Sequence, residues 1–269
     1  MIIDIHTHAF PDRIYERTIQ ILEQNILEYS NKEFHATGSG NVSGLQASMA
    51  EDGIDCSLVL PIATAPKQTE SINRFAAQIN GTNGIFSFGS LHPSQNDTDG
   101  ILEKIAEAGL RGIKLHPEYQ KFYVDSPEAL KIFKKCEQLG LYCMLHTGAD
   151  HGCPPPIHGS PKRLSHVLDY VRGDRIIAAH MGGWSMWKEA QKYIIGTPIL
   201  IDTCFSLHLM PSEQAVQMIR AHGADKVMVG SDWPWYSQEK SVELVKGLNL
   251  SAEETAQICG ENARRILGI

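Results

Sequence analysis

The chain has 269 residues, of which 42% are apolar, 20% charged and 7% aromatic. This composition is typical of a folded globular protein and supplies enough apolar side chains for a sizeable core. A net charge of −7 argues against a surface that binds nucleic acid or an anionic membrane. No apolar run approaches the roughly 20 residues that a membrane-spanning helix needs. We therefore expect neither nucleic-acid nor membrane partners.

The cysteines and the first residues favour a cytoplasmic protein. The first residues show no charged segment followed by an apolar stretch and a cleavage site, the pattern of a secretory signal. No two cysteines form a C-x-x-C pair, so we expect reduced thiols that mostly fill small spaces in the core. The six cysteines are Cys56, Cys136, Cys143, Cys153, Cys204 and Cys259.

Taken in order, the chain alternates between apolar strands and helical patterns. It opens in a strand, and apolar residues then recur at helical spacing over residues 11–29. Ser43 can cap a short helix that runs through Met49 and stops at Gly53. Further strands are predicted over 56–60, 85–91, 112–116, 141–146, 175–180, 198–203 and 226–232. Further helices are predicted over 67–80, 97–108, 127–139, 161–171, 184–193, 211–222, 238–245 and 251–267.

This alternation predicts an α/β fold with a parallel sheet. Several of the strands are continuous apolar runs, as expected for a sheet that is covered on both faces. Eight strand–helix units in 269 residues favour a closed (β/α)8 TIM barrel over an open sheet. No linker divides the chain, so residues 1–269 are predicted to form a single domain. The proline-rich stretch 153–156 lies in a long loop after the fifth strand, where a functional flap is expected.

The first strand ends in His6 and His8, two imidazoles separated by one residue. Side chains of a strand alternate between its faces, so this spacing places both rings side by side. Imidazole is the commonest protein metal ligand, and the pair suits chelation of one ion. The alternative is two polar residues that happen to end a strand.

Other polar side chains fall at the carboxyl ends of predicted strands, the edge at which barrel enzymes place their active sites. Each residue alone could be a surface residue or a helix cap. Together they suggest one site, because unrelated structural needs would not converge on one rim. A set of three imidazoles and one carboxylate, which these residues can supply, suits Zn²⁺, Mn²⁺, Fe²⁺ or Co²⁺. The residues beyond the first strand are Lys114, His116, His146, His180 and Asp232.

The motifs that contain these residues resemble the amidohydrolase superfamily. They are similar to its amidohydrolase-related branch, which includes aminocarboxymuconate semialdehyde decarboxylase, other non-oxidative decarboxylases and lactonases. The motifs span residues 4–234, nearly the whole chain, and they identify the superfamily without identifying a substrate. They read Asp-Ile-His-Thr-His, Gly-Ile-Lys-Leu-His-Pro, Leu-His-Thr-Gly, His-Met-Gly-Gly and Gly-Ser-Asp-Trp-Pro.

The resemblance implies a divalent metal, with Zn²⁺ the first expectation. Asp232 would also be catalytic, accepting a proton from a metal-activated water and delivering it to the leaving group. His180 would be a second catalytic acid or base, or in a two-ion centre a ligand together with Lys114. The Lys-x-His-Pro phrase favours one ion, with Lys114 and His116 clamping an anionic group of the substrate. The implied metal ligands are His6, His8, His146 and Asp232.

Two loop residues are further candidates for substrate binding. His151 lies in the loop after the fifth strand, and Trp233 follows Asp232 and could wall an apolar pocket. For each of them a purely structural role is the alternative.

Three functions fit these motifs. The first is hydrolysis of a small, carboxylated ester, lactone or amide, which the compact length of the chain favours. The second is non-oxidative decarboxylation of a small unsaturated or aromatic acid by the same ligands. The third, a barrel that binds without catalysis, is disfavoured because Asp232 and the His6/His8 pair are intact. The resemblance also suggests a homodimer.

Overall fold

The computed structural model describes residues 1–269, and all the pairings between its strands are parallel. The strands form two runs, β1-β2-β3 and β4-β5-β6-β7-β8. The bounds of the strands are β1 Ile3–Thr7, β2 Cys56–Val59, β3 Ile85–Ser87, β4 Gly112–Leu115, β5 Tyr142–Leu145, β6 Ile176–Ala178, β7 Leu200–Asp202 and β8 Val227–Met228.

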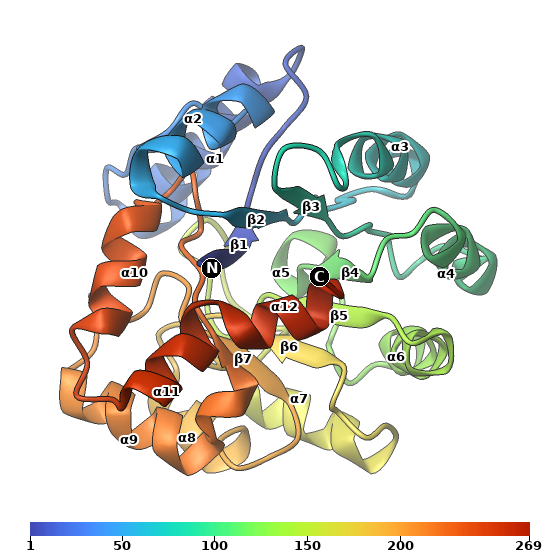
Figure 1. The fold of residues 1–269 in the computed structure, drawn as a ribbon. Helices are drawn as coiled ribbons and strands as arrows, with labels where there is room; N and C mark the ends of the chain where they lie inside the picture. The colour runs from blue at the N-terminus through green and yellow to red at the C-terminus, as the bar shows by residue number, and fades with distance from the viewer.

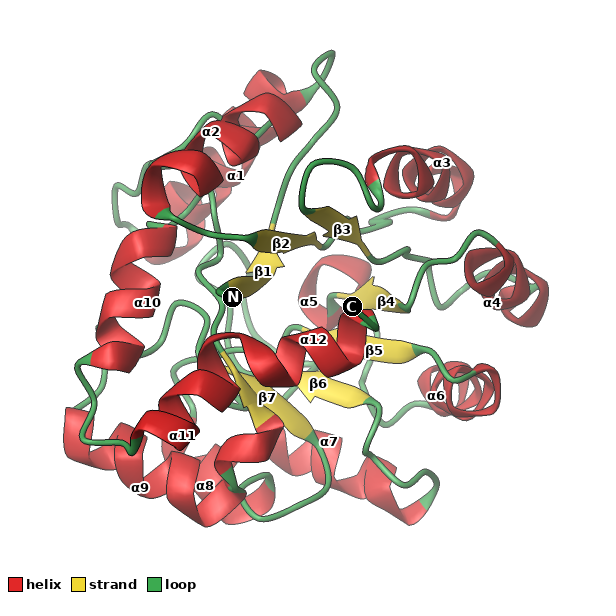
Figure 2. Ribbon diagram, in the orientation of Figure 1, coloured by secondary structure: helices red, strands yellow, loops and turns green.

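Short backbone contacts join the two runs into a closed barrel. A bridge between Gly89 and Ile113 connects the segment after β3 to β4. On the other side, the N–H of Ile5 donates to the carbonyl of Val229, and Thr7 pairs with Trp233. Helices surround the ring of strands (Figure 1, Figure 2). The predicted (β/α)8 TIM barrel is confirmed.

The helices lie between the strands in sequence, as predicted. Shorter helical turns cover Pro66–Gln68, Val167–Asp169 and Ala224–Lys226, and a π-helical turn covers Gln257–Glu261. No helix is long and apolar enough to cross a membrane. The α-helices are α1 Tyr15–Ser30, α2 Val42–Asp52, α3 Thr69–Ile79, α4 Thr98–Glu107, α5 Pro117–Gln120, α6 Pro127–Leu139, α7 Pro161–His166, α8 Trp187–Tyr193, α9 Ser212–His222, α10 Gln238–Lys246, α11 Ala252–Ala256 and α12 Asn262–Leu267.

Several element ends differ from the sequence prediction. The cap of α2 is Asn41, whose side chain accepts the N–H of Gly44, and not Ser43. The eighth strand stops at Met228 and does not reach Asp232, because the chain leaves the ladder to enter the site. The short helix α5 was not predicted. It forms because Pro117 suits the first helical position and His116 caps it.

The apolar core has two parts. Forty-seven buried residues form the larger cluster, which includes residues of most of the surrounding helices, and fourteen form a smaller one. The smaller cluster combines inward side chains of the strands, such as Ile3 and Met144, with Ile266 and Leu267 of α12. Figure 1 shows α12 lying across the barrel beside the N-terminus. The amino end of the barrel is therefore apolar and filled, which leaves the carboxyl end for polar side chains.

Asp4 fastens β1 to the segment after β8. Its buried carboxylate accepts the hydroxyl of Ser231 at 2.5 Å and the backbone N–H of the same residue at 3.0 Å. The side-chain amide of Gln238, in α10, donates to it at 2.8 Å. Burial raises the pKa of Asp4 to about 6, although these hydrogen bonds favour the charged form.

Asp4 should therefore make stability depend on pH in mild acid. Its folded pKa lies above the unfolded value of about 3.9, so the folded chain holds this proton longer as the pH rises. The free energy of unfolding of the wild type should fall between about pH 4 and pH 6, relative to Asp4→Asn, by about 3 kcal/mol. Urea unfolding across this range measures the difference. Asp225→Asn, at an exposed carboxylate, should show the same pH dependence as the wild type. If the free energy of unfolding of Asp4→Asn fell with pH as steeply as that of the wild type, Asp4 would not be the titrating group.

Candidate active site

The residues predicted from the strand ends all lie at the carboxyl end of the barrel. His6 is in β1 and His8 directly follows it, while Lys114 is in β4. His146 directly follows β5, His180 lies two residues past β6, and Asp232 lies four residues past β8. The pairing of β1 with β2 shifts register between Asp4 and Thr7, where the strand passes from the apolar core to the site.

His6, His8 and Asp232 form one group whose ligand atoms lie within 4.8 Å of one another. The Nε2 atom of His8 is 3.1 Å from Oδ1 of Asp232, and the Nε2 atom of His6 is 3.6 Å from the same oxygen. His6 is only 1% exposed, and the side chains of His8 and Asp232 are 13% and 17% exposed. These three residues could hold one ion at the bottom of a site that stays accessible from the rim.

Hydrogen bonds on the far side of each ring fix which nitrogen carries the proton. Nδ1 of His6 lies 2.8 Å from a carboxylate oxygen of Asp202, and Nδ1 of His8 lies 3.0 Å from the carbonyl of Leu60. Both partners are acceptors, so both Nδ1 atoms carry the proton and both Nε2 atoms present a lone pair. The Nε2 atom of His8 and the carboxylate of Asp232 are then two acceptors in contact. A cation between them resolves this repulsion.

The same conflict recurs between His146 and His180. Nε2 of His146 donates to the carbonyl of Ala149 at 2.9 Å, and Nδ1 of His180 donates to the carbonyl of Cys204 at 3.0 Å. The remaining nitrogens face each other at 3.1 Å, both without a proton in this arrangement. Metal-binding histidines typically donate their other N–H to a carbonyl or carboxylate in this way. The donor set therefore fits a divalent cation.

The charge states also suit metal binding. Burial lowers the pKa of His180 to about 3 and that of His6 well below its ordinary value. Both rings are therefore neutral at pH 7, the form that binds metals. A carboxylate and neutral imidazoles thus share the site.

Lys114 brings an amine to the bottom of the site. Its Nζ lies 3.2 Å from Nε2 of His6, and the residue is 1% exposed. Burial lowers the pKa of this amine, while the carboxylates of Asp232 and Asp202 act in the opposite direction. Lys114 therefore lies where it could contact either a second ion or the anionic group of a substrate.

His116 belongs to a different kind of cluster, with His146 and Asp150. Nε2 of His116 lies 3.2 Å from the carboxylate of Asp150, and its Nδ1 accepts the backbone N–H of Tyr119. Its ring stacks on that of His146 at 4.2 Å between centroids. Every donor here meets an acceptor, so this cluster needs no cation. Burial lowers the pKa of His116 to about 3, and Asp150 orients the ring.

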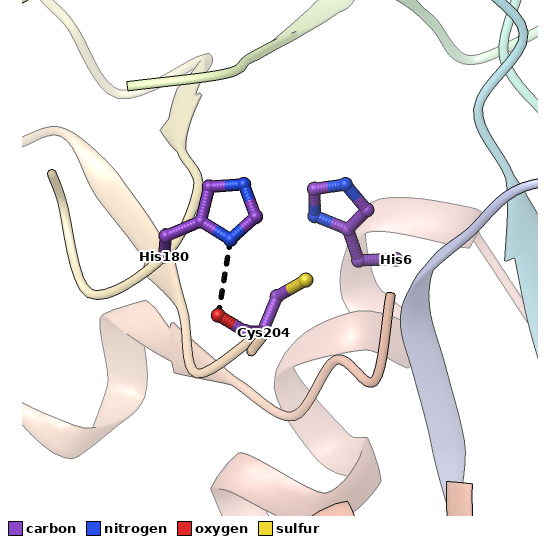
Figure 3. Close-up of side chains that lie close together, drawn as sticks. All are labelled: His6, His180 and Cys204. Atoms are coloured by element: carbon purple, nitrogen blue, oxygen red, sulfur yellow. Dashed lines mark hydrogen bonds between the residues drawn. The ribbon is translucent and has the colours of Figure 1, made fainter. Parts of the chain in front are cut away.

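Sequence reasoning missed Asp202 and Cys204 at the end of β7. One oxygen of Asp202 contacts His6, and the other accepts the backbone N–H groups of His180 and Cys204. Figure 3 shows the side chains of His6, His180 and Cys204 close together. The phrase Asp-Thr-Cys at the end of the predicted strand 198–203 was the available signal, since this strand end meets the same rim as the others.

Residues at this rim adopt backbone conformations that side chains rarely take. The φ angles are 61° at His180, 45° at Phe205 and 70° at Asp232. Such positive values persist only where the surroundings hold them, and they concentrate at functional sites. The N–H of His180 bonds to Asp202, and the N–H of Asp232 bonds to the carbonyl of His6. These bonds offset the strain and aim both side chains at the centre.

The two loop candidates, His151 and Trp233, have different surroundings. His151 packs edge-on against Trp184 with ring centroids 4.3 Å apart. Trp233 is buried in the larger core cluster, close against Gly38, where an added Cβ would come within 2.6 Å of the indole. Trp235, two residues further on, instead contacts Phe34, which also meets Phe205. Substrate contact by His151 or Trp233 stays a prediction.

The family model described as "Amidohydrolase" matches residues 3–269. This chain belongs to the amidohydrolase family. The predicted membership is thereby confirmed, and with it the assignment to an enzyme family. No curated protein matches the sequence.

Solved structures of low sequence identity share the fold over its full length. The 5-carboxyvanillate decarboxylase of Sphingomonas paucimobilis has 18% identity and a TM-score of 0.69, covering 100% of this chain and 99% of that one. The enzyme of the same name from Novosphingobium aromaticivorans, complexed with manganese and 4-hydroxy-3-methoxy-5-nitrobenzoic acid, has 14% identity and a TM-score of 0.70, with coverages of 100% and 96%. The apo IDCase of Metarhizium anisopliae has 18% identity and a TM-score of 0.73, with coverages of 100% and 97%.

Loss of the acceptor behind His6 should weaken metal binding. Asp202→Asn leaves the shape of the side chain but replaces a charged acceptor that orients two histidines. We expect the affinity for Co²⁺ or Zn²⁺ to fall about 10–100-fold, the usual effect of losing such a partner. Titration calorimetry of the metal-free protein measures this. Asp174→Asn, at an exposed carboxylate before β6, is the matched control, and equal affinities in both variants would contradict the role of Asp202.

Proposed function

We propose that this chain is a metal-dependent, non-oxidative decarboxylase of a small aromatic or unsaturated carboxylic acid. The full-length similarity to decarboxylases of hydroxylated aromatic acids carries this choice over hydrolysis, the first expectation from sequence. The argument for hydrolysis from a compact chain loses its force, since the match covers 99% of the Sphingomonas decarboxylase. Three neighbouring structures contain manganese, so zinc has no special support among the candidate ions.

The proposed ligands are those named from the sequence. His6, His8 and Asp232 supply three ligand atoms that already lie close together. The fourth proposed ligand is His146, which follows β5 and whose unprotonated Nδ1 faces Nε2 of His180 at 3.1 Å. A divalent ion held there supplies positive charge that binds the oxygens of the acid and offsets the negative charge developing as carbon dioxide leaves.

Decarboxylation breaks the bond between the carboxylate carbon and its neighbour. The electron pair of that bond stays on the neighbouring carbon, which must then take up one proton. We assign this proton transfer to Asp232 and His180, which face the centre from β8 and β6. The neutral His180 accepts a proton from solvent and delivers it to the carbon. Asp232 forms a hydrogen bond to the group that carries the proton and helps to relay it.

The surrounding side chains suit an aromatic acid. We assign the anionic group of the substrate to Lys114, whose amine lies at the base of the site. The ring of Phe34 contacts that of Phe205 and that of Trp235, with centroids 5.6 Å and 6.0 Å apart, respectively. These rings offer an apolar surface at the rim for an aromatic or unsaturated carbon skeleton.

Replacing the carboxylate that both binds metal and moves the proton should stop turnover. We expect Asp232→Asn to lower kcat by at least about 10²–10⁴-fold, while circular dichroism shows an intact fold. The assay measures carbon dioxide from a panel of hydroxybenzoic and muconate-type acids, alongside hydrolysis of lactones. Asp174→Asn is the control. Lactone hydrolysis without release of carbon dioxide would overturn the proposed reaction, and full activity in Asp232→Asn would overturn its role.

Lys114 should affect substrate binding through its charge. Lys114→Met keeps the length of the side chain and removes the amine, so a substrate carboxylate loses a charge-assisted hydrogen bond. We expect KM to rise about 10–100-fold, corresponding to the roughly 1.5–3 kcal/mol of such a bond. Steady-state kinetics with the best acid of the panel measures the change. An unchanged KM would instead show that Lys114 does not contact the substrate.

A further inference from the structure

The indole N–H of Trp184 is buried and has no hydrogen-bonding partner. The structure contains only two other buried side-chain atoms of this kind, Nε2 of His222 in α9 and Oε1 of Gln238 in α10. Trp184 alone of the three belongs to a loop at the carboxyl end of the barrel, because it lies between β6 and α8. A buried donor without an acceptor is costly, so its presence at this rim calls for an explanation.

The ring of Trp184 is buried without being part of the apolar core. The residue is 8% exposed, yet it belongs to neither of the two apolar clusters. Trp233, by comparison, belongs to the larger cluster. The ring of Trp184 instead contacts that of His151, in the loop after β5, edge-on with centroids 4.3 Å apart. The burial of Trp184 therefore comes from the loops of the rim and not from the core.

Backbone hydrogen bonds fasten Trp184 to the segment that holds His146, a proposed metal ligand. The N–H of Trp184 donates to the carbonyl of Thr147 at 2.8 Å, and its carbonyl accepts the N–H of Ala149 at 3.0 Å. The carbonyl of Ala149 in turn accepts Nε2 of His146. Trp184 also follows His180 by four residues, so its backbone lies between two walls of the barrel that carry the proposed centre. The residue consequently has a fixed place beside that centre.

His151 adds a hydrogen-bond acceptor next to this donor. Burial and the charge of Lys32 lower the pKa of His151, so its ring is neutral at pH 7. A neutral imidazole has one nitrogen with a lone pair, whereas the indole nitrogen can only donate. The two side chains therefore offer a donor and an acceptor side by side. A hydroxyl group satisfies both, because its oxygen accepts and its hydrogen is donated.

We propose that Trp184 and His151 bind a hydroxyl group of the substrate and so select hydroxylated acids. The indole N–H donates to the hydroxyl oxygen, and the neutral imidazole accepts the hydroxyl hydrogen. An ether oxygen in the same place satisfies only the indole, and a plain C–H group leaves the buried donor unpaired. The inference rests on the proposed function, since the hydroxyl group belongs to the acid that the proposed centre binds.

Binding of simple acids to the full-length protein loaded with Mn²⁺ tests the proposal without turnover. Titration calorimetry measures Kd for benzoate and for its ortho, meta and para hydroxy and methoxy derivatives. We expect the wild type to bind one hydroxy acid about 10-fold more tightly than benzoate and than the matching methoxy acid. Trp184→Phe keeps an aromatic ring and removes the N–H. It should abolish the preference over benzoate and bind benzoate itself as the wild type does.

His151→Phe is the second variant, which keeps a ring beside Trp184 and removes the acceptor. It should abolish the preference for the hydroxy acid over the methoxy acid, while the indole N–H still favours either over benzoate. Because His151 is partly exposed, this variant tests the pair even where Trp184→Phe does not fold. Tyr170→Phe, which removes a hydroxyl from an exposed ring, is the control and should keep every preference of the wild type.

The outcomes separate this inference from the proposed function. Equal affinity of the wild type for benzoate and every hydroxy acid would overturn the hydroxyl site and leave the proposed decarboxylation standing. A preference that survives in Trp184→Phe or in His151→Phe would overturn the role of that residue. An equal loss of affinity for benzoate and the hydroxy acid would show a merely structural role and likewise overturn the site. If no acid of the set binds, the proposed substrate class fails, and the hydroxyl site with it.

Discussion

The arrangement at the carboxyl end of the barrel depends on where the imidazole protons lie. Four histidines donate one N–H each to acceptors outside the centre, namely a side-chain carboxylate and three backbone carbonyls. Their other nitrogens consequently face inward with lone pairs. A buried site in which several acceptors converge is unfavourable unless a cation occupies it. The acceptors around the rings, most of them backbone carbonyls, thus make the site favour a cation.

The barrel separates this polar centre from the apolar interior. Side chains such as Ile3 and Ile177 fill the amino half, and helix α12 covers that end. Polar side chains placed in the amino half would have no hydrogen-bonding partners. The opposite rim offers them the carbonyls and N–H groups at the strand ends. The register shift in β1 marks the boundary between the two environments.

The fold and most of the candidate site could be predicted from sequence, because both follow local patterns. Apolar runs separated by helical periodicity determine the strand order, and His6, His8, His146, His180 and Asp232 each fall just inside or beyond one strand. Asp202 and Cys204 escaped notice because their importance comes from contacts with residues 22 or more positions away. The end of β8 was misplaced for a similar reason: a tertiary bond to His6 draws Asp232 out of the ladder.

The Asp4–Ser231 bond also bears on how the protein is made. The two residues lie 227 positions apart, so nearly the whole chain must leave the ribosome before β1 gains its second neighbour. Until then, the earliest imidazoles to emerge, His6 and His8, lie on a strand with one open edge. For the proposed metal centre, full-strength binding therefore comes late in biosynthesis, after the ring of strands has closed. A nascent chain that ends before β8, which begins at Val227, would have neither a closed barrel nor a complete centre.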